Sequence, residues 1–428
     1  ETRHGPVISD SYARAKRAID TNRYALALRW TALDQENQSA AALLELNRAK
    51  DIDSFRQLLR KNYAPMQNVV MADIDGNIAY QAAGVAPKRV LHQGLYGVAP
   101  APGWEKQYDW HGYVPFEQLP TSYNPEQGWI ATANQRIIAT NDPNPLTADW
   151  DISARYNRIV QLIRSKELHD ISSMKTMQAD TISLSSIPLL EIFKSSKPTH
   201  PLAPQALAII DNFNADMRSD SSAALIFNAW ADQLTRNLFS RLGYIFAQTY
   251  GEKNYRTSLI NELKDPNNPW CDNPNTEAIE SCQEASNDAF NKALDYLSKE
   301  YGNDPSKWKW GNAHMAISEH RPFSKIPILG TLFNLETPFP GDSNTINVGR
   351  LELLRSDKPY ETLQAPSLRA IYDLSDLEKS LFIYQSGQSG WIQSKFYRNM
   401  QPLWANNEYL PLQMKPENIK RTLELNNK

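Results

Sequence analysis

The hydrophobic pattern of this chain changes its period twice, and the resulting order constrains the fold more than any single motif does. Up to about residue 150, apolar residues gather in short strand-like runs, such as 24–32 and 128–138. Apolar residues then recur at helical spacing, and strand and loop signals return after Asp304-Pro305. This order predicts an α+β fold with a helical middle and three regions, 1–150, 151–303 and 304–428.

Two local signals sharpen the prediction for the first region. Residues 41–61 carry apolar side chains at helical spacing, which predicts a helix. Residues 67–84 contain two strand-like runs on either side of Asp75-Gly76. An Asp-Gly pair between such runs is typical of a hairpin turn, so we expect a β-hairpin here.

Charge and hydropathy argue against two classes of partner. The chain has 428 residues, with 45 Lys and Arg against 48 Asp and Glu, so its net charge is -3. General nucleic-acid binding is not expected, because neutralising phosphates requires a basic surplus. The mean hydropathy is -0.55, and no run approaches the roughly 18 apolar residues that a membrane span requires.

The two cysteines, Cys271 and Cys282, flank a segment rich in Pro and Asn. Their closeness favours a disulfide that closes a small loop, and unlinked thiols are the alternative. Because disulfides persist in oxidising compartments, we expect the protein in the periplasm or outside the cell. The opening residues, Glu1 to Ile8, show no leader sequence and resemble the middle of a chain, so we expect a processed or truncated product.

No complete catalytic motif is visible in the residues alone. The 7 histidines do not pair at metal-binding spacing, and no nucleophile elbow or phosphate-binding loop occurs. Asn134 ends an apolar run, where an asparagine is either an ordinary cap or an amide donor for an oxyanion. The amino-acid composition does not favour either of these two roles.

Several blocks in order along the chain carry a family resemblance. They are TRHGPVI (2–8), DIDGNIAY (73–80), VPFEQLPTSYNPEQGWIATANQR (114–136), PGDSNTIN (340–347) and the C-terminal run 367–412. These blocks resemble the large chain of penicillin acylases and acyl-homoserine-lactone acylases. The resemblance implies the four-layer αββα fold of the N-terminal nucleophile hydrolases.

The resemblance also implies a mechanism and partners. In that family a precursor is cut into a small (alpha) and a large chain, and the N-terminal Ser of the large chain attacks an amide carbonyl, with its own amine as the base. We expect this Ser to lie upstream of Glu1. The expected partners are therefore the small chain, the N-terminal part of the large chain and a small-molecule N-acyl substrate.

Three site residues follow from matching this sequence to the family. Asn134 matches the asparagine whose amide stabilises the oxyanion, and Arg158 matches an arginine that orients that asparagine and the substrate. Arg155 is the alternative if the match is off by one helical turn, and a solvated helix charge is the alternative role for Arg158. Asp149 matches a carboxylate of the family's structural Ca²⁺ site, whereas a helix N-cap is the other role open to Asp149 and Asp151.

Two other functions stay open at this point. A non-catalytic binding or scaffold protein could keep the acylase fold without the nucleophile. The 11 Trp and 19 Tyr also allow carbohydrate binding, but no motif places the paired carboxylates that glycoside hydrolysis requires.

Overall fold

The computed structural model describes residues 2–91, 94–251, 255–274, 276–354, 357–415, 419 and 422–424. The chain divides into two compact units, Glu1–Ser153 and Ala154–Lys428. The second unit contains both the helical and the C-terminal regions expected from the sequence. The division into three regions stays a prediction.

The first unit is built around a small antiparallel sheet with the order β1-β2-β3. Its strands are β1 (Gln67–Ala72), β2 (Ile78–Ala83) and β3 (Thr121–Tyr123). The predicted hairpin is confirmed, since β1 and β2 pair on either side of Asp75-Gly76. The Asp73 carboxylate closes this turn by accepting the N–H groups of Asp75 and Asn77 at 3.0 and 2.9 Å.

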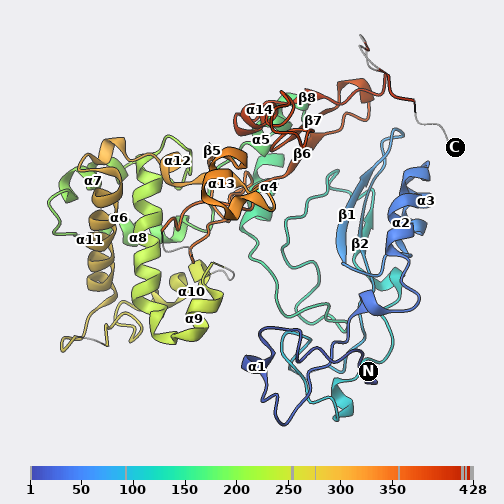
Figure 1. Cartoon of the computed structure of the whole chain (residues 1–428), viewed down its shortest axis with the longest axis horizontal. Coiled ribbons are helices and arrows are strands. Elements are labelled where there is room, and N and C mark those ends of the chain that lie inside the picture. Colours follow the sequence, from blue (N-terminus) through green and yellow to red (C-terminus); the bar gives the residue numbers. More distant parts are fainter. Residues whose placement is uncertain are drawn as a thin grey trace. The chain divides into compact units, whose positions relative to one another are not determined.

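Helices cover one face of this hairpin (Figure 1). The helices of the unit are α1 (Ala15–Ala18), α2 (Ser39–Glu45) and α3 (Ile52–Leu59). Buried Ile52 and Leu59 of α3 pack against Met71, Ala79 and Ala83 of the hairpin. The apolar face of α3 therefore forms one of the two buried apolar clusters found in the described part of the first unit.

The helical structure predicted over 41–61 is confirmed in part, because two helices with a break between them occupy this segment. A 3-10 turn follows α2 at Leu46–Arg48, and Asp51 then starts a new helix as its N-cap. The Asp51 carboxylate accepts a hydrogen bond from the Ser54 N–H at 2.7 Å. The Ser54 hydroxyl oxygen in turn accepts one from the Asp51 N–H. Such a capping box favours a helix start over a continued helix.

Two runs predicted as strands form only isolated bridges, between Val7 and Ala27 and between Gln135 and Asp151. The first ladder ends beside Pro6, which has no N–H to donate. In the second, Asn134 has a φ of 64°, and a left-handed residue interrupts the extended backbone that a strand requires. The predictions of strands at 24–32 and 128–138 are therefore wrong.

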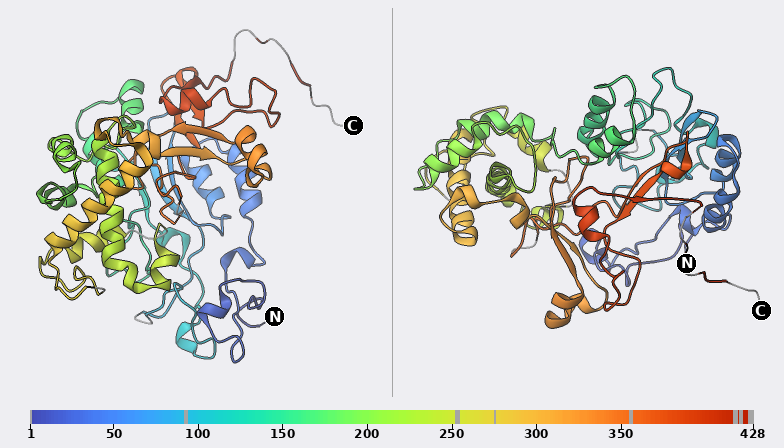
Figure 2. Two further views of the ribbon diagram at one scale, coloured as in Figure 1. Left: turned by 60° about the vertical axis from the view of Figure 1, so that its left-hand side comes forward. Right: turned by 90° about the horizontal axis from the view of Figure 1, so that it is seen from above.

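Helices dominate the second unit. Their bounds are α4 Ala154–Ile163, α5 Ile171–Gln178, α6 Leu190–Ser195, α7 Ala203–Ile210, α8 Ser222–Phe239, α9 Tyr244–Thr249, α10 Tyr255–Glu262, α11 Cys282–Tyr301, α12 Trp310–Ala313, α13 Pro327–Phe333 and α14 Gln401–Ala405. Helices α8 and α11 run side by side (Figures 1 and 2). An aromatic cluster lies between their buried faces. The ring of Phe193 from α6 stacks on that of Phe290 from α11, with 5.3 Å between the ring centroids, and its centroid lies 5.0 Å from that of Trp230 from α8. This cluster forms the centre of the largest apolar core.

Two small antiparallel sheets complete the second unit. One pairs β4 (Met315–Ser318) with β5 (Leu335–Pro338), and the other has the order β6-β7-β8 with strands β6 Leu368–Ile371, β7 Leu381–Tyr384 and β8 Leu410–Pro411. Short 3-10 turns elsewhere in the chain lie at Thr31–Leu33, Lys106–Tyr108, Phe116–Gln118, Ile187–Leu189, Ser240–Leu242, Pro305–Lys307, Phe323–Lys325 and Leu377–Lys379. Mixed helices and antiparallel sheets confirm the α+β class.

The predicted disulfide is present between Cys271 and Cys282. Cys282 is the first residue of α11, which has a capping box formed by Ser281 and Glu284. The disulfide thus ties the preceding loop to the start of a long core helix.

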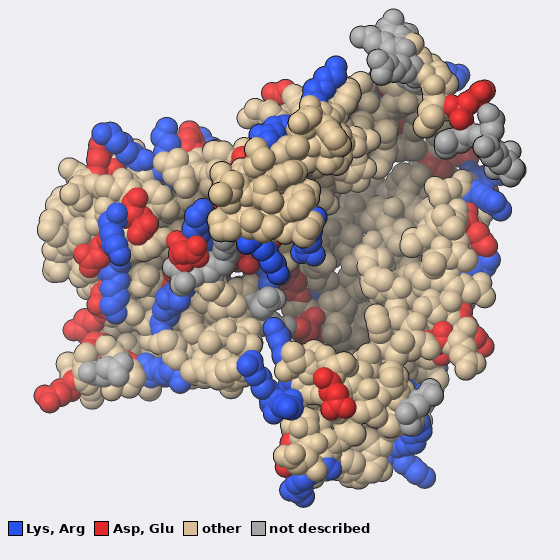
Figure 3. Space-filling model, in the orientation of Figure 1, with Lys and Arg blue, Asp and Glu red and all other residues tan. Residues whose placement is uncertain are grey.

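The described residues form no helix that is both long and apolar enough to cross a membrane. On the face drawn in Figure 3, acidic and basic side chains are interspersed over the helical part at the left. On this part of the drawn face, acidic and basic groups therefore offset one another.

Candidate functional site

Asn134 lies at a bend of the backbone in the first unit, which we call the Asn134 turn. Its φ of 64° is left-handed, a conformation that asparagine tolerates better than most residues. Its neighbours Ala133 and Gln135 are buried, at 9% and 8% exposure, whereas Asn134 itself is exposed. An exposed amide on a backbone anchored at both sides is suited to donate a hydrogen bond to a ligand oxygen.

Side chains that the sequence analysis did not single out hold this turn. The Gln135 side-chain oxygen accepts the Ala133 N–H at 2.7 Å. The Tyr80 hydroxyl donates to the Asn68 side-chain oxygen at 2.7 Å, and the Asn68 amide donates to the Thr132 hydroxyl at 3.1 Å. Partial burial raises the pKa of Tyr80 to about 12, so its hydroxyl stays a donor at neutral pH. The only sequence signal for this support is the polar residue directly after Asn134.

Asp149 belongs to the segment that runs beside this turn, because Gln135 and Asp151 form a parallel bridge. Asp149 does not occupy the N-cap position of α4, since that helix begins five residues later at Ala154. The Asp151 carboxylate accepts the Ile152 N–H at 2.8 Å, also outside the helix. The N-cap alternative for these two residues is therefore wrong.

Asp149 is the residue that the family resemblance assigns to a calcium site. The residue is exposed, and a carboxylate is a suitable ligand for a hard cation. However, the described residues gather no group of three or more His, Cys, Asp or Glu side chains that could hold a metal ion. The calcium role of Asp149 therefore stays a prediction from the family resemblance.

Arg158 lies on α4 in the second unit and forms a two-pronged ion pair with Asp180. Its Nε and Nη2 lie 3.0 and 2.7 Å from the two carboxylate oxygens. The arginine side chain is only 21% exposed and that of Asp180 only 11%. Because Asp180 accepts these hydrogen bonds, it raises the pKa of Arg158 above its usual value. The solvated-charge alternative for Arg158 is wrong.

Asp180 is itself held by the block 340–347. The Asp180 carbonyl oxygen accepts the Asn347 N–H at 3.0 Å, and the Asn347 side-chain oxygen accepts a hydrogen bond from Arg369 at 2.7 Å. Asn347 is fully buried and Arg369 nearly so. The ion pair of Arg158 therefore has a buried support in the PGDSNTIN block, a role that the sequence did not predict for this block.

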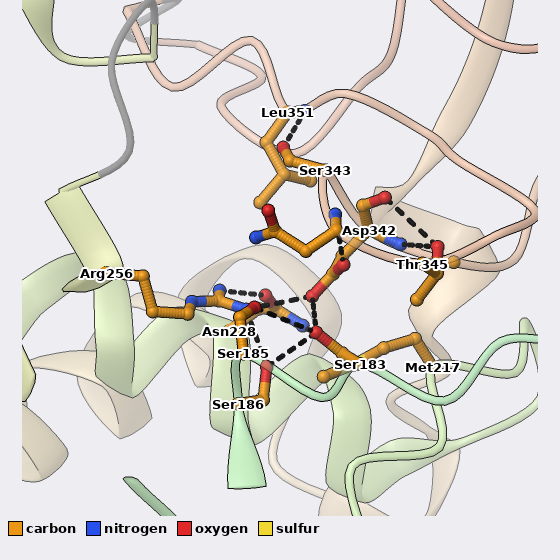
Figure 4. Close-up of polar contacts among 12 residues, drawn as sticks. Ser183, Ser185, Ser186, Met217, Asn228, Arg256, Asp342, Ser343, Thr345 and Leu351 are labelled. Atoms are coloured by element: carbon orange, nitrogen blue, oxygen red, sulfur yellow. Dashed lines mark hydrogen bonds and ion pairs between the residues drawn. The ribbon is translucent and has the colours of Figure 1, made fainter. Parts of the chain in front are cut away.

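A second buried network lies in the same unit (Figure 4). The Asp342 carboxylate accepts hydrogen bonds from Ser183 at 2.7 Å and from Arg256 of α10 at 2.8 Å, and it also accepts the Asn344 N–H at 2.7 Å. Arg256 in turn donates to Ser186 at 2.6 Å. These donors satisfy the carboxylate, so we assign the cluster a structural role rather than a nucleophilic one.

The glycine before Asp342 makes this packing possible. Gly341 has a φ of 86°, and a Cβ built on it would lie 2.0 Å from the Asn347 carbonyl oxygen. Only glycine can occupy this position without displacing the backbone. The PGDSNTIN block thus connects the Asp342 network to the support of Arg158.

A model of the penicillin amidase family matches residues 1–421. The chain belongs to this family. It is 26% identical to the acyl-homoserine lactone acylase QuiP of Pseudomonas aeruginosa over 460 residues, which cover 98% of this chain and 53% of that protein. It is 24% identical to the penicillin acylase 2 proenzyme of Pseudomonas sp. over 419 residues, 96% of this chain and 51% of that protein.

The fold agrees with this membership. The thermostable penicillin G acylase from Alcaligenes faecalis is similar at a TM-score of 0.67 and 18% sequence identity, over 100% of this chain and 78% of that chain. The predicted α+β fold of a penicillin acylase is thus confirmed, and the four αββα layers stay a prediction. This penicillin amidase family chain spans about half the length of the curated relatives it matches.

The structure distributes the predicted site residues over both units. Asn134 and Asp149 lie in the first unit on neighbouring segments, and Arg158 lies in the second. Their assignment to an oxyanion donor, a calcium ligand and an orienting arginine stays a prediction from the family resemblance.

Proposed function

We propose that the complete protein hydrolyses an N-acyl amide into a carboxylic acid and an amine, as its relatives' names indicate for acyl-homoserine lactones and penicillins. The observation that carries this proposal is the family match over residues 1–421. The exposed, left-handed Asn134 adds a local argument, because an amide donor on a rigid turn is suited to bind developing negative charge.

The proposed reaction uses an N-terminal Ser from a part of the protein outside this sequence. Its hydroxyl oxygen attacks the amide carbonyl while its own α-amine takes the proton. The carbonyl electron pair moves onto oxygen, and the Asn134 side-chain N–H donates to that oxyanion. The carbon–nitrogen bond then breaks, the amine leaves with the proton, and water hydrolyses the resulting ester to the free acid.

In the orienting role that the family resemblance implies, Arg158 would act through the part of its guanidinium that Asp180 does not use. Two of its nitrogens bind the Asp180 carboxylate, and Nη1 lies 3.3 Å from the Gln161 side-chain oxygen. A neutral glutamine gives up such a contact more readily than a carboxylate would, so Nη1 is the nitrogen best suited to a ligand.

The test replaces Asn134 by Ala in the complete protein and measures amine release from an N-acyl-homoserine lactone and from a penicillin. We expect kcat to fall by about 10²–10³-fold with an unchanged circular dichroism spectrum, the usual cost of losing one oxyanion donor. Full activity of Asn134→Ala would show that the site assignment is wrong. Complete absence of hydrolysis in the wild type would favour the binding or scaffold alternative.

Asn124→Ala provides a matched control. Asn124 is also exposed and left-handed, with a φ of 42°, and its side chain binds the Ile78 N–H at 2.9 Å and the Asn77 side chain at 2.8 Å. Its loss should lower stability and leave kcat within a few-fold of wild type, because it only holds the hairpin. A similar drop in kcat for both variants would point to general loosening of the first unit.

We also propose that the protein binds structural calcium with Asp149 as one ligand and that it works in the periplasm or outside the cell. A carboxylate next to the Asn134 turn supports the first proposal, and the disulfide supports the second. Calcium would add rigidity to the segment beside Asn134. Metal analysis of the complete protein, with and without Asp149→Asn, tests the ligand.

A further inference from the structure

The turn that carries Asn134 is closed by a side chain. Gln135 is 8% exposed, and its side-chain oxygen accepts the N–H of Ala133 at 2.7 Å, across Asn134. The backbone of Gln135 is held in turn by the parallel bridge to Asp151. The residue after Asn134 therefore fixes both the residue before it and its own place against a neighbouring segment.

A second contact anchors the chain two residues before Asn134. The Thr132 hydroxyl accepts the Asn68 amide N–H at 3.1 Å, and the Asn68 side-chain oxygen accepts the Tyr80 hydroxyl at 2.7 Å. Asn68 lies on β1 and Tyr80 on β2, two strands that pair along their whole length. This relay connects the turn to the most regular part of the first unit.

Asn134 itself has a backbone conformation that most residues avoid, and such a conformation persists only where the surroundings over-determine it. Gln135 supplies that constraint on one side and the relay supplies it on the other. Hydrogen bonds to an oxyanion stabilise the transition state because the donor is already in place before the reaction. A donor displaced by about 1 Å can therefore slow the reaction by about 10²-fold.

We infer that Gln135, together with the Tyr80–Asn68–Thr132 relay, positions the Asn134 amide for the oxyanion. The inference rests on the proposed function and adds positioning residues to it. Gln135 and Tyr80 touch no reacting atom in this account, since their contacts are to the turn and to β1.

The first experiment replaces Gln135 by Met in the complete protein. Met has a similar volume but no oxygen acceptor for the Ala133 N–H. We expect kcat to fall by about tenfold to 10²-fold with KM within about twofold of wild type, because the loss affects the transition state. Gln135→Glu keeps a side-chain oxygen acceptor and should recover most of this loss.

Tyr80→Phe provides a milder variant in case Gln135→Met fails to fold. It removes only the hydroxyl that binds Asn68 and keeps the ring in place. We expect a fall in kcat of a few-fold, in the same direction as for Gln135→Met, since the relay is one bond further from Asn134. An unchanged kcat in Tyr80→Phe would remove the relay from the inference.

Double variants separate positioning from a merely structural role. In an Asn134→Ala background, Gln135→Met should lower kcat no further, because no amide is left to position. An equal fall in both backgrounds would overturn the inference while leaving the proposed function intact. If Asn134→Ala alone keeps full activity, the oxyanion assignment fails and the inference fails with it.

Discussion

His314 shows at the scale of one residue how burial sets a protonation state. Its ring is fully buried and stacks on Trp310 at 4.7 Å, and Nδ1 lies 2.6 Å from the Tyr360 carbonyl oxygen. The proton must be on Nδ1 to make this bond. Burial lowers the pKa of His314 to about 4. Between about pH 6.5 and 4 the unfolded chain therefore binds more protons, and stability is lost as the pH falls.

We expect His314→Asn to reduce this pH dependence, because Asn keeps a donor for the Tyr360 carbonyl and has no titrating ring. Between about pH 6.5 and 4, the free energy of unfolding of the wild type should fall by up to about 3 kcal/mol more than that of the variant. Urea unfolding at several pH values across this range measures how steeply the free energy of unfolding of each protein depends on pH. His111→Asn, at an exposed position of the first unit, should leave the wild-type slope unchanged. Parallel slopes for wild type and His314→Asn would contradict the assignment.

At the scale of elements, the disulfide holds a loop against the start of α11. Cys271 and Cys282 are separated by 11 residues, and the Cys282 N–H donates to the Pro266 carbonyl at 2.8 Å. We expect the double variant Cys271→Ser/Cys282→Ser to lose about 3 kcal/mol of unfolding free energy, by the loop-entropy account. Thermal unfolding with and without reductant measures this loss, and reductant should affect the wild type alone.

The same two cysteines test the proposed compartment. Protein taken directly from the cell and alkylated before any oxidation should carry no label on either cysteine if the disulfide forms in the periplasm or outside. Labelling of both cysteines in protein isolated in this way would contradict that localisation.

At the scale of the whole molecule, the chain covers about half the length of its curated relatives, so its proposed chemistry needs the rest of the protein. We expect denaturing mass spectrometry of the complete protein to show two chains. N-terminal sequencing should find a Ser at the start of the chain that contains this sequence. A single uncut chain that still hydrolyses N-acyl substrates would rule out the N-terminal Ser mechanism.

Features set by neighbours in the chain were predictable from the sequence. The hairpin follows from Asp75-Gly76 between apolar runs, and the disulfide from two cysteines close in sequence. Both depend on contacts over a few residues, which leave a local signal. The ordered motif blocks, spread over nearly the whole chain, sufficed to recognise the family.

Other features needed the tertiary structure, because their partners lie far apart in sequence. The two strands predicted at 24–32 and 128–138 shrink to isolated bridges, since a strand also requires a partner segment that pairs with it over several residues. Asp180 lies 22 residues after Arg158 and became its partner only through the fold.

The sequence by itself thus determined the α+β class, the family and the residue types at the candidate site. The fold alone decided the support of the Asn134 turn by Asn68, the bridge between Gln135 and Asp151, and the buried pair of Arg158 with Asp180. The physical reason is that chemistry needs side chains in fixed relative positions, and those positions come from hydrogen bonds and packing between distant segments.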